Sequence, residues 1–162
     1  MKSNELIKRI SYNAIICALY VALVFIFSFM SYESILVRLA EVLIFIVLIN
    51  KRYTIGITMG CFIANLIGPF GLIDAIVGSI ATYLCCIMLI YVKRAWVGIF
   101  ILPICNILVG LEIAFLSNAN YEATLMIIFF VMIGEIIAGI LGTLVYKVII
   151  RKKELIELIN NI

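Results

Sequence analysis

The stretch Gly60–Thr82, GCFIANLIGPFGLIDAIVGSIAT, decides the fold of this chain. It is apolar enough to be hidden from water, yet it carries an amide at Asn65 and a carboxylate at Asp74 on either side of a Gly-Pro-Phe-Gly turn. Polar groups in membrane helices are rare and mark functional sites. We therefore predict a hairpin of two membrane helices, the first ending at Pro69 and the second restarting at Gly71, whose polar groups help to form a substrate pocket.

Composition places the whole chain in a bilayer. Its 162 residues are 67% hydrophobic and 13% charged, which leaves too little polar surface for a soluble globule. A helix needs ~20 mainly apolar residues to cross the hydrocarbon. Six segments are candidates, roughly 10–30, 35–49, 53–70, 72–92, 96–116 and 123–150. We expect an all-α integral membrane protein in which residues 1–150 form a single six-helix transmembrane domain, with no room for a soluble catalytic or ATPase domain.

Basic residues alternate from loop to loop. Lys and Arg precede the first predicted span, join the second to the third and the fourth to the fifth, and follow the sixth, whereas the other three loops have none. The positive-inside rule therefore places both termini in the cytoplasm. Residues 151–162, RKKELIELINNI, are expected to form a short cytoplasmic amphipathic tail at the lipid interface. Nucleic-acid binding is a poor alternative, because the charges form short membrane-edge pairs without interleaved aromatic residues.

The residue types argue against an enzyme and against a metal or cofactor site. All five cysteines fall inside predicted spans, and the chain has no CxxC motif and no histidine, so buried free thiols are expected. Neither a Ser-His dyad nor a two-aspartate dyad can be built, and the nucleotide-binding glycine motifs are absent. A proton-coupled carrier stays open as an alternative, since buried carboxylates can relay protons.

Small residues recur every fourth position, a spacing that lets helices approach closely. In the first span they are Ala14, Ala18 and Ala22, and a helix of this chain and an external partner are both candidates for that face. In the third and fourth spans, small residues predict close antiparallel packing of the two helices. These residues are Gly56, Gly60, Ala64 and Gly68 in the third span and Ala75, Gly78, Ser79 and Thr82 in the fourth.

Ionisable side chains inside the predicted spans form one pattern. Arg38 and Glu41 are spaced i to i+3, so they lie on one side of a helix and can pair. The predicted topology places some polar residues toward the outer ends of the spans and others deeper. The outer ones are Arg38, Glu41, Asp74, Glu112 and Asn65, and the deeper ones are Asn106 and Glu135. The four carboxylates exceed the single arginine by three, so they must be protonated, paired or satisfied by a ligand. A cation or another ligand rich in N–H donors fits such a site.

These features resemble the substrate-binding S components of energy-coupling factor (ECF) transporters, and within that family the queuosine-precursor (QueT-type) group. The resemblance rests on the six spans, the AxxxAxxxA face, RLAE at 38–41 and the hairpin stretch, with further matches at Asn106, Glu112 and Gly134-Glu135. It implies a multi-pass protein of the bacterial plasma membrane. Ala14, Ala18 and Ala22 would face a transmembrane scaffold subunit coupled to two cytoplasmic ATPases. The S component would capture substrate outside and topple in the membrane to release it inside.

The resemblance also implies pocket or pocket-supporting roles for the polar residues. These are Arg38, Glu41, Asn65, Asp74, Asn106, Glu112 and Glu135. A 7-deazaguanine offers adjacent N–H donors to one carboxylate, and an aminomethyl arm offers a cation to another. We expect Glu41 and Glu135 to recognise the base edge, and Arg38 to orient Glu41.

Two aromatic residues and two other functions complete the expectations. Tyr32 or Tyr121 is a candidate for stacking on the substrate ring, with an interfacial aromatic belt as the other role for each. An S component for a different vitamin or nucleobase is one alternative function. A non-transporting membrane scaffold, in which the polar residues only hold helices together, is the other.

Overall fold

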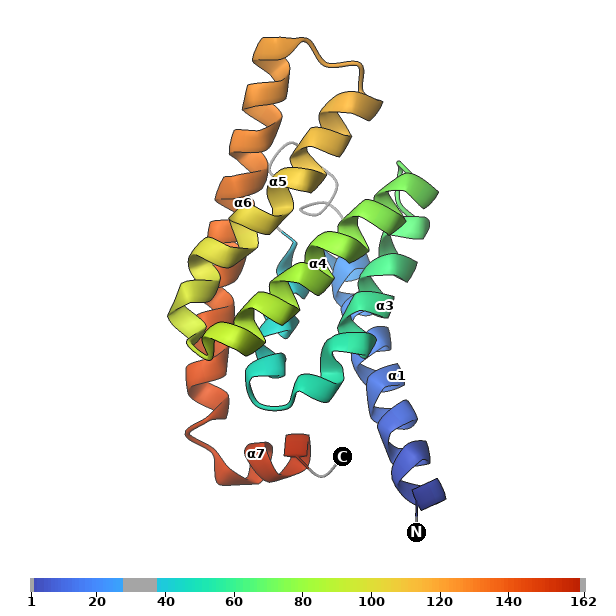
Figure 1. Cartoon of the computed structure of the whole chain (residues 1–162), viewed down its shortest axis with the longest axis vertical. Coiled ribbons are helices and arrows are strands. Elements are labelled where there is room, and N and C mark those ends of the chain that lie inside the picture. The colour runs from blue at the N-terminus through green and yellow to red at the C-terminus, as the bar shows by residue number, and fades with distance from the viewer. Residues whose placement is uncertain (1, 28–37, 161–162) are drawn as a thin grey trace.

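The computed structural model describes residues 2–27 and 38–160, and every element in these ranges is helical, as the sequence predicts. In chain order the elements are α1 (Lys2–Ile26), η1 (Leu39–Leu48), η2 (Lys51–Tyr53), α3 (Thr54–Leu66), α4 (Leu72–Val92), η3 (Ala95–Val97), α5 (Gly98–Leu116), α6 (Tyr121–Ile149) and α7 (Lys153–Asn160), where η denotes a 3₁₀ helix. The long helices form a bundle, and the short helix α7 lies across one end of it (Figure 1).

Within residues 2–27 and 38–160, four helical segments are long and apolar enough to cross a membrane. They are Leu6–Ile26, Leu72–Val92, Ala95–Leu116 and Tyr121–Ile149. The other two predicted spans are shorter, because α3 has 13 residues and η1 has 10. Each is roughly 20 Å long at the usual rise per residue, against a hydrocarbon thickness of ~30 Å. The six-span arrangement stays a prediction for these two segments.

The α3–α4 hairpin forms, but its first helix ends earlier than predicted. The last residue of α3 is Leu66 instead of Pro69, and the turn begins where Gly68 N donates to Asn65 O at 2.9 Å. A proline disfavours helical backbone in the residue before it, so the chain must leave the helix ahead of Pro69. Gly71 has φ +63°, which glycine adopts without strain, and α4 starts at the next residue, as expected.

The predicted packing of α3 against α4 is confirmed, but Gly56 and Gly60 of the small-residue stripe of α3 face α1. A Cβ added to Gly60 would lie 2.7 Å from Tyr20 Cβ, and one added to Gly56 would lie 2.6 Å from Asn13 O. In addition, Gly56 N donates a hydrogen bond of 2.8 Å to Asn13 Oδ1. The two helices α3 and α4 still pack together, but the polar side of α3 makes that contact.

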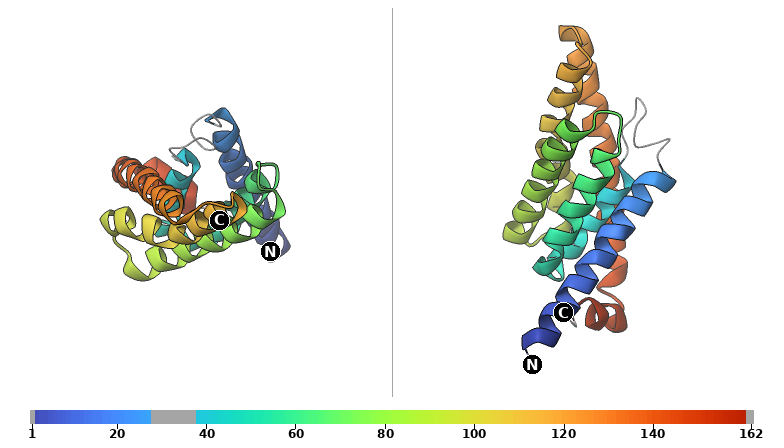
Figure 2. Two further views of the ribbon diagram at one scale, coloured as in Figure 1. Left: turned by 90° about the horizontal axis from the view of Figure 1, so that it is seen from above. Right: turned by 90° about the vertical axis from the view of Figure 1, so that its right-hand side faces the viewer.

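Helix η1 lies inside the bundle, where it packs against α1, α3, α4 and α6 (Figure 2). A 3₁₀ helix has three residues per turn, so side chains three positions apart align. Glu41, Ile44 and Val47 are accordingly all buried. The ring of Phe45 packs against Gly98 and Gly142, where a larger residue would not fit. A Cβ on Gly142 would overlap the ring, and a Cβ on Gly98 would come within 2.6 Å of it. These contacts hold Glu41 at a defined depth.

The two ends of the bundle differ in charge. The basic segments 51–52, 93–94 and 151–153 lie toward the end that carries both chain termini (Figure 1). The α3–α4 turn and the α5–α6 loop lie toward the other end. Arg38 is buried in the interior and is the exception to this separation. The distribution matches the alternation in the sequence.

Candidate functional site

The folded chain buries all seven polar side chains that the sequence singled out in the spans. They come from η1 and the residue before it, from α3, α4, α5 and α6, and are Arg38, Glu41, Asn65, Asp74, Asn106, Glu112 and Glu135. Residues up to 97 positions apart in the chain meet in one region, since Arg38 and Glu135 lie within electrostatic range of each other. We call these seven residues the polar cluster.

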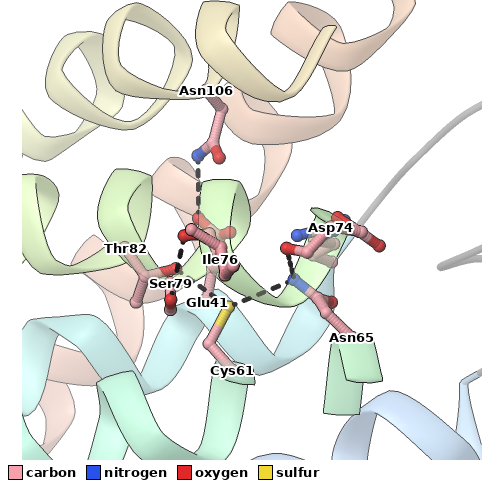
Figure 3. Close-up of polar contacts among 9 residues, drawn as sticks. Glu41, Cys61, Asn65, Asp74, Ile76, Ser79, Thr82 and Asn106 are labelled. Carbon is pink, nitrogen blue, oxygen red and sulfur yellow. Dashed lines mark hydrogen bonds and ion pairs between the residues drawn. The ribbon is translucent and has the colours of Figure 1, made fainter. Parts of the chain in front are cut away.

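One half of the polar cluster is built around Glu41. Asn106 reaches from α5 and donates from Nδ2 to Glu41 Oε2 at 3.2 Å (Figure 3). The same Nδ2 donates to Leu102 O at 3.1 Å, which fixes the amide on its own helix. The carboxyl groups of Glu41 and Glu135 lie within electrostatic range of each other. Carboxylates are acceptors only, so such a pair suits a ligand that donates hydrogen bonds.

The other half is built around Asp74 at the start of α4. Arg38 Nη2 and Asp74 Oδ1 form an ion pair of 3.4 Å, and both side chains are almost fully buried. Asn65 Nδ2 donates to the backbone oxygen of Asp74 at 3.2 Å and to Cys61 Sγ at 3.5 Å (Figure 3). Gly78 makes room for this amide, since a Cβ at that position would overlap Asn65 Nδ2. The hairpin thus fixes the position of Asp74.

Glu112 lies beside this second half. It is 8% exposed and interacts electrostatically with Asp74 and Arg38. Neither of its carboxylate oxygens has a hydrogen-bond partner among the residues that the structure describes. A buried carboxylate without a partner is costly, so Glu112 is the side chain of the cluster most in need of a ligand.

The expected pairing of Arg38 with Glu41 is wrong, because Arg38 pairs with Asp74. Arg38 is the N-cap of η1, with φ −81° and ψ 82°, so it precedes the first helical residue. The i to i+3 rule holds only when both residues are helical. Arg38 therefore lies within electrostatic range of Glu41 without an ion pair to it, and Asn106 makes the direct hydrogen bond to that carboxylate.

Two residues that sequence reasoning did not single out also belong to this region. Tyr20 of α1 is 1% exposed, and its hydroxyl lies beside Cys61, within electrostatic range of Glu41 and Arg38. Cys61 Sγ accepts hydrogen bonds from Asn65 and, at 3.2 Å, from Thr82 Oγ1. The sequence offered no signal for Tyr20, because tyrosine is equally common at a lipid interface.

The remaining predicted residues lie apart from the cluster or outside the described residues. Tyr121, the first residue of α6, is 78% exposed and does not join the buried polar side chains. Tyr32 lies outside the described residues. Ala14, Ala18 and Ala22 are all exposed along α1, so the interior of this chain does not use the face that they form.

The free atoms of the polar cluster define the ligand that it suits. Four carboxylate oxygens are buried without a partner in the described ranges, namely Glu41 Oε1, Glu135 Oε2 and both oxygens of Glu112. Arg38 Nη1 is the corresponding unpartnered donor. Acceptors exceed donors, so a ligand that brings several N–H groups, or a positive charge, satisfies the cluster. Within residues 2–27 and 38–160 no group of three or more Cys, Asp or Glu side chains is arranged to hold a metal ion.

Two comparisons with known proteins give the chain relatives. A protein-family model described as "QueT transporter" matches residues 10–151. Over 71 residues the chain is 42% identical to a protein of Lactococcus lactis subsp. cremoris (strain MG1363) named "Queuosine precursor transporter QueT". That match covers 43% of this chain and 41% of the relative, so it spans about two fifths of the relative's length. No solved structure matches the chain significantly.

Proposed function

The chain belongs to the QueT transporter family, and from this premise we propose that it is the membrane-embedded subunit that captures a queuosine precursor for uptake. The substrate class is a 7-deazaguanine base, namely queuine, preQ1 or preQ0. The observation that carries the proposal is the excess of buried, unpartnered carboxylate oxygens over donors in the polar cluster. The name of the Lactococcus lactis relative supports the same substrate class.

The chemistry of such a base complements the polar cluster. Its ring N–H and exocyclic amine lie side by side, so they can donate to the free oxygens of Glu41 and Glu135, which lie within electrostatic range of each other. A hydrogen bond from a neutral donor to a buried charged acceptor contributes about 1.5 to 3 kcal/mol. A cationic aminomethyl arm, where the precursor has one, is suited to Glu112, whose oxygens both lack partners among the described residues.

The energy for uptake comes from partners in this proposal. The chain is an S component with six spans and both termini in the cytoplasm of a bacterial cell, and it works with an ECF scaffold subunit and two ATPases. Ala14, Ala18 and Ala22 support the scaffold contact because they form an exposed face of small side chains, which suits close packing of a foreign helix. Asn13, which precedes Ala14, joins α1 to α3 through its hydrogen bond with Gly56. The three alanines are exposed, so the face that they form is available to a partner.

Calorimetry with purified protein tests the substrate assignment. We expect binding of preQ1, preQ0 or queuine, and we expect Glu41→Gln and Glu135→Gln each to weaken it at least tenfold, ~1.4 kcal/mol. Glu122→Gln is the matched control, because Glu122 also lies on α6 but is exposed. If both cluster variants bind like the wild type, the assignment of these carboxylates is wrong. Mass spectrometry of the copurified small molecule identifies the base directly, and another vitamin there would overturn the substrate class.

Copurification tests the partner assignment. We expect Ala18→Trp to abolish copurification with the scaffold and ATPase subunits while thermal unfolding is unchanged, because Ala18 is exposed. Leu19→Trp is the control, since Leu19 is 43% exposed and points about 100° away around the helix. If the wild-type chain copurifies with no ECF scaffold subunit, or if Ala18→Trp unfolds the chain, the proposal is contradicted. Either result supports the alternative that the chain itself is a non-transporting membrane scaffold.

A further inference from the structure

A cavity lies away from the polar cluster, at the end of the bundle that carries the termini. Its volume is about 630 Å³. Its polar lining consists of Asn50, Lys51, Arg52, Lys93 and Asn160, with no carboxylate. We call it the basal pocket. The connection between η1 and η2, the end of α4 and the end of α7 form it together, so it exists only in the folded chain.

Hydrogen bonds fix the frame of the basal pocket. Asn50 Oδ1 accepts from Arg52 N at 3.1 Å, and Asn50 Nδ2 donates to Ile159 O of α7 at 3.1 Å. Tyr53 Oη donates to the same carbonyl oxygen at 3.3 Å. Two side chains thus hold α7 beside the η1–η2 connection. The side chain of Asn50 is used in this frame. The lysines of the lining, Lys51 and Lys93, are the groups that we consider for contact with a ligand.

The two lysines of the basal pocket line the same cavity, and the described part of the chain brings no carboxylate into its lining. Lys51 and Lys93 are exposed, and neither forms an ion pair with a described side chain. Lys93 caps α4 with φ 55°, a left-handed conformation that is unfavourable for a lysine. Its backbone N–H bonds to Leu89 O at 2.9 Å. The acidic residues of α7, Glu154 and Glu157, do not line the pocket, so its field is positive.

The other walls of the pocket are apolar. Val47, Leu48, Ile49 and Ile90 line it from η1 and α4. Helix α7 is strongly amphipathic and lies across this end of the bundle (Figure 1), as interfacial helices do. A site with basic residues above an apolar wall at the membrane surface suits a molecule with an anionic head and an apolar tail.

We propose that the basal pocket binds the phosphate group of an anionic phospholipid of the surrounding bilayer. Lys51 and Lys93 contact the phosphate, and Arg52 adds positive charge at the rim. The apolar wall contacts the start of an acyl chain. The lipid connects the η1–η2 connection, α4 and α7 at one end of the protein. A free phosphate has the same head chemistry, but it would leave the apolar wall without a partner.

Native mass spectrometry of the full chain, released from nanodiscs of mixed phosphatidylglycerol and phosphatidylcholine, tests this proposal. The variant is Lys51→Gln with Lys93→Asn, because asparagine tolerates the left-handed backbone at position 93. The control is Lys147→Gln with Lys152→Gln, which removes the same charge from exposed positions that do not line the pocket. We expect wild type and control to retain phosphatidylglycerol over phosphatidylcholine. The pocket variant should reduce that preference about 30-fold, or ~2 kcal/mol for two basic residues near the surface.

Two results would overturn the proposal. Equal retention of phosphatidylglycerol by the pocket variant, with an unchanged thermal unfolding curve, places the lipid elsewhere. Displacement of the bound lipid by an equal concentration of inorganic phosphate makes the free anion, and not the lipid, the ligand of the pocket. The substrate assay is independent of both results, because the basal pocket shares no residue with the polar cluster.

Discussion

The ion pair between Arg38 and Asp74 gives the sharpest test of how the polar cluster is held together. Arg38→Met removes the cation and keeps most of the side-chain volume, and Asp74→Asn removes the anion with little change of shape. The double variant removes both charges. Thermal unfolding of the four proteins in detergent gives a double-mutant cycle for the pair. Arg94→Met is the control for loss of an arginine, since Arg94 is exposed.

The magnitude follows from the geometry. Two unit charges 3.4 Å apart attract by about 5 kcal/mol at an effective dielectric constant near 20. Removing one partner of a buried pair costs about 3 to 5 kcal/mol, because the other charge stays buried. For a chain of this length we expect Arg38→Met to lower the unfolding temperature by roughly 6 to 20 °C. Asp74→Asn should cost less, since Arg38 also interacts with Glu41 and Glu112.

The double variant decides between two explanations. We expect it to regain part of the stability that Arg38→Met loses, because the unpaired Asp74 charge is gone, although Glu41 and Glu112 still lack the Arg38 charge. If the two single losses simply add in the double variant, the charges do not interact and the pairing described above is wrong. A loss of the same size in Arg94→Met would show instead that the assay responds to net charge.

Three further predictions use the same unfolding and calorimetric assays. Gly142→Ala should destabilise the protein by about 1 to 3 kcal/mol, because the new Cβ overlaps Phe45, and Phe45→Leu in the same chain should restore part of the loss. Gly60→Ala should cost a similar amount, since its Cβ comes 2.7 Å from Tyr20 Cβ; an unchanged unfolding temperature would contradict the α1–α3 packing. Asn106→Leu removes the donor to Glu41 and should cost about 1 to 3 kcal/mol and weaken substrate binding in calorimetry.

The packing of α1 explains why its two small-residue features differ. Asn13, Cys17 and Tyr20 face α3, where Gly56 and Gly60 admit them closely. The alanines at 14, 18 and 22 lie on the exposed side of α1. Spacing alone cannot distinguish these cases, because small residues allow close approach by any helix. The partner helix became known only from the tertiary contacts.

The 3₁₀ form of η1 was not predictable from its residues. Leu39–Leu48 is a continuous apolar run around Glu41, and such a run has no periodicity that separates an α-helix from a 3₁₀ helix. The tighter helix is long for its type. It aligns Glu41 with Ile44 and Val47 on one buried row and sets Phe45 against Gly142. Neighbouring helices therefore decide its geometry.

The sequence by itself determined the helical class, the apolar surface, the hairpin around Pro69 and the burial of the seven residues of the polar cluster. It could do so because burying a charge is costly, so each ionisable residue in an apolar run already indicates an interior site. Only the tertiary structure decided which residues meet. Arg38 pairs with Asp74, 36 positions away, and Asn106 contacts Glu41, 65 positions away. Such contacts depend on how helices from distant parts of the chain pack, and local spacing does not contain that information.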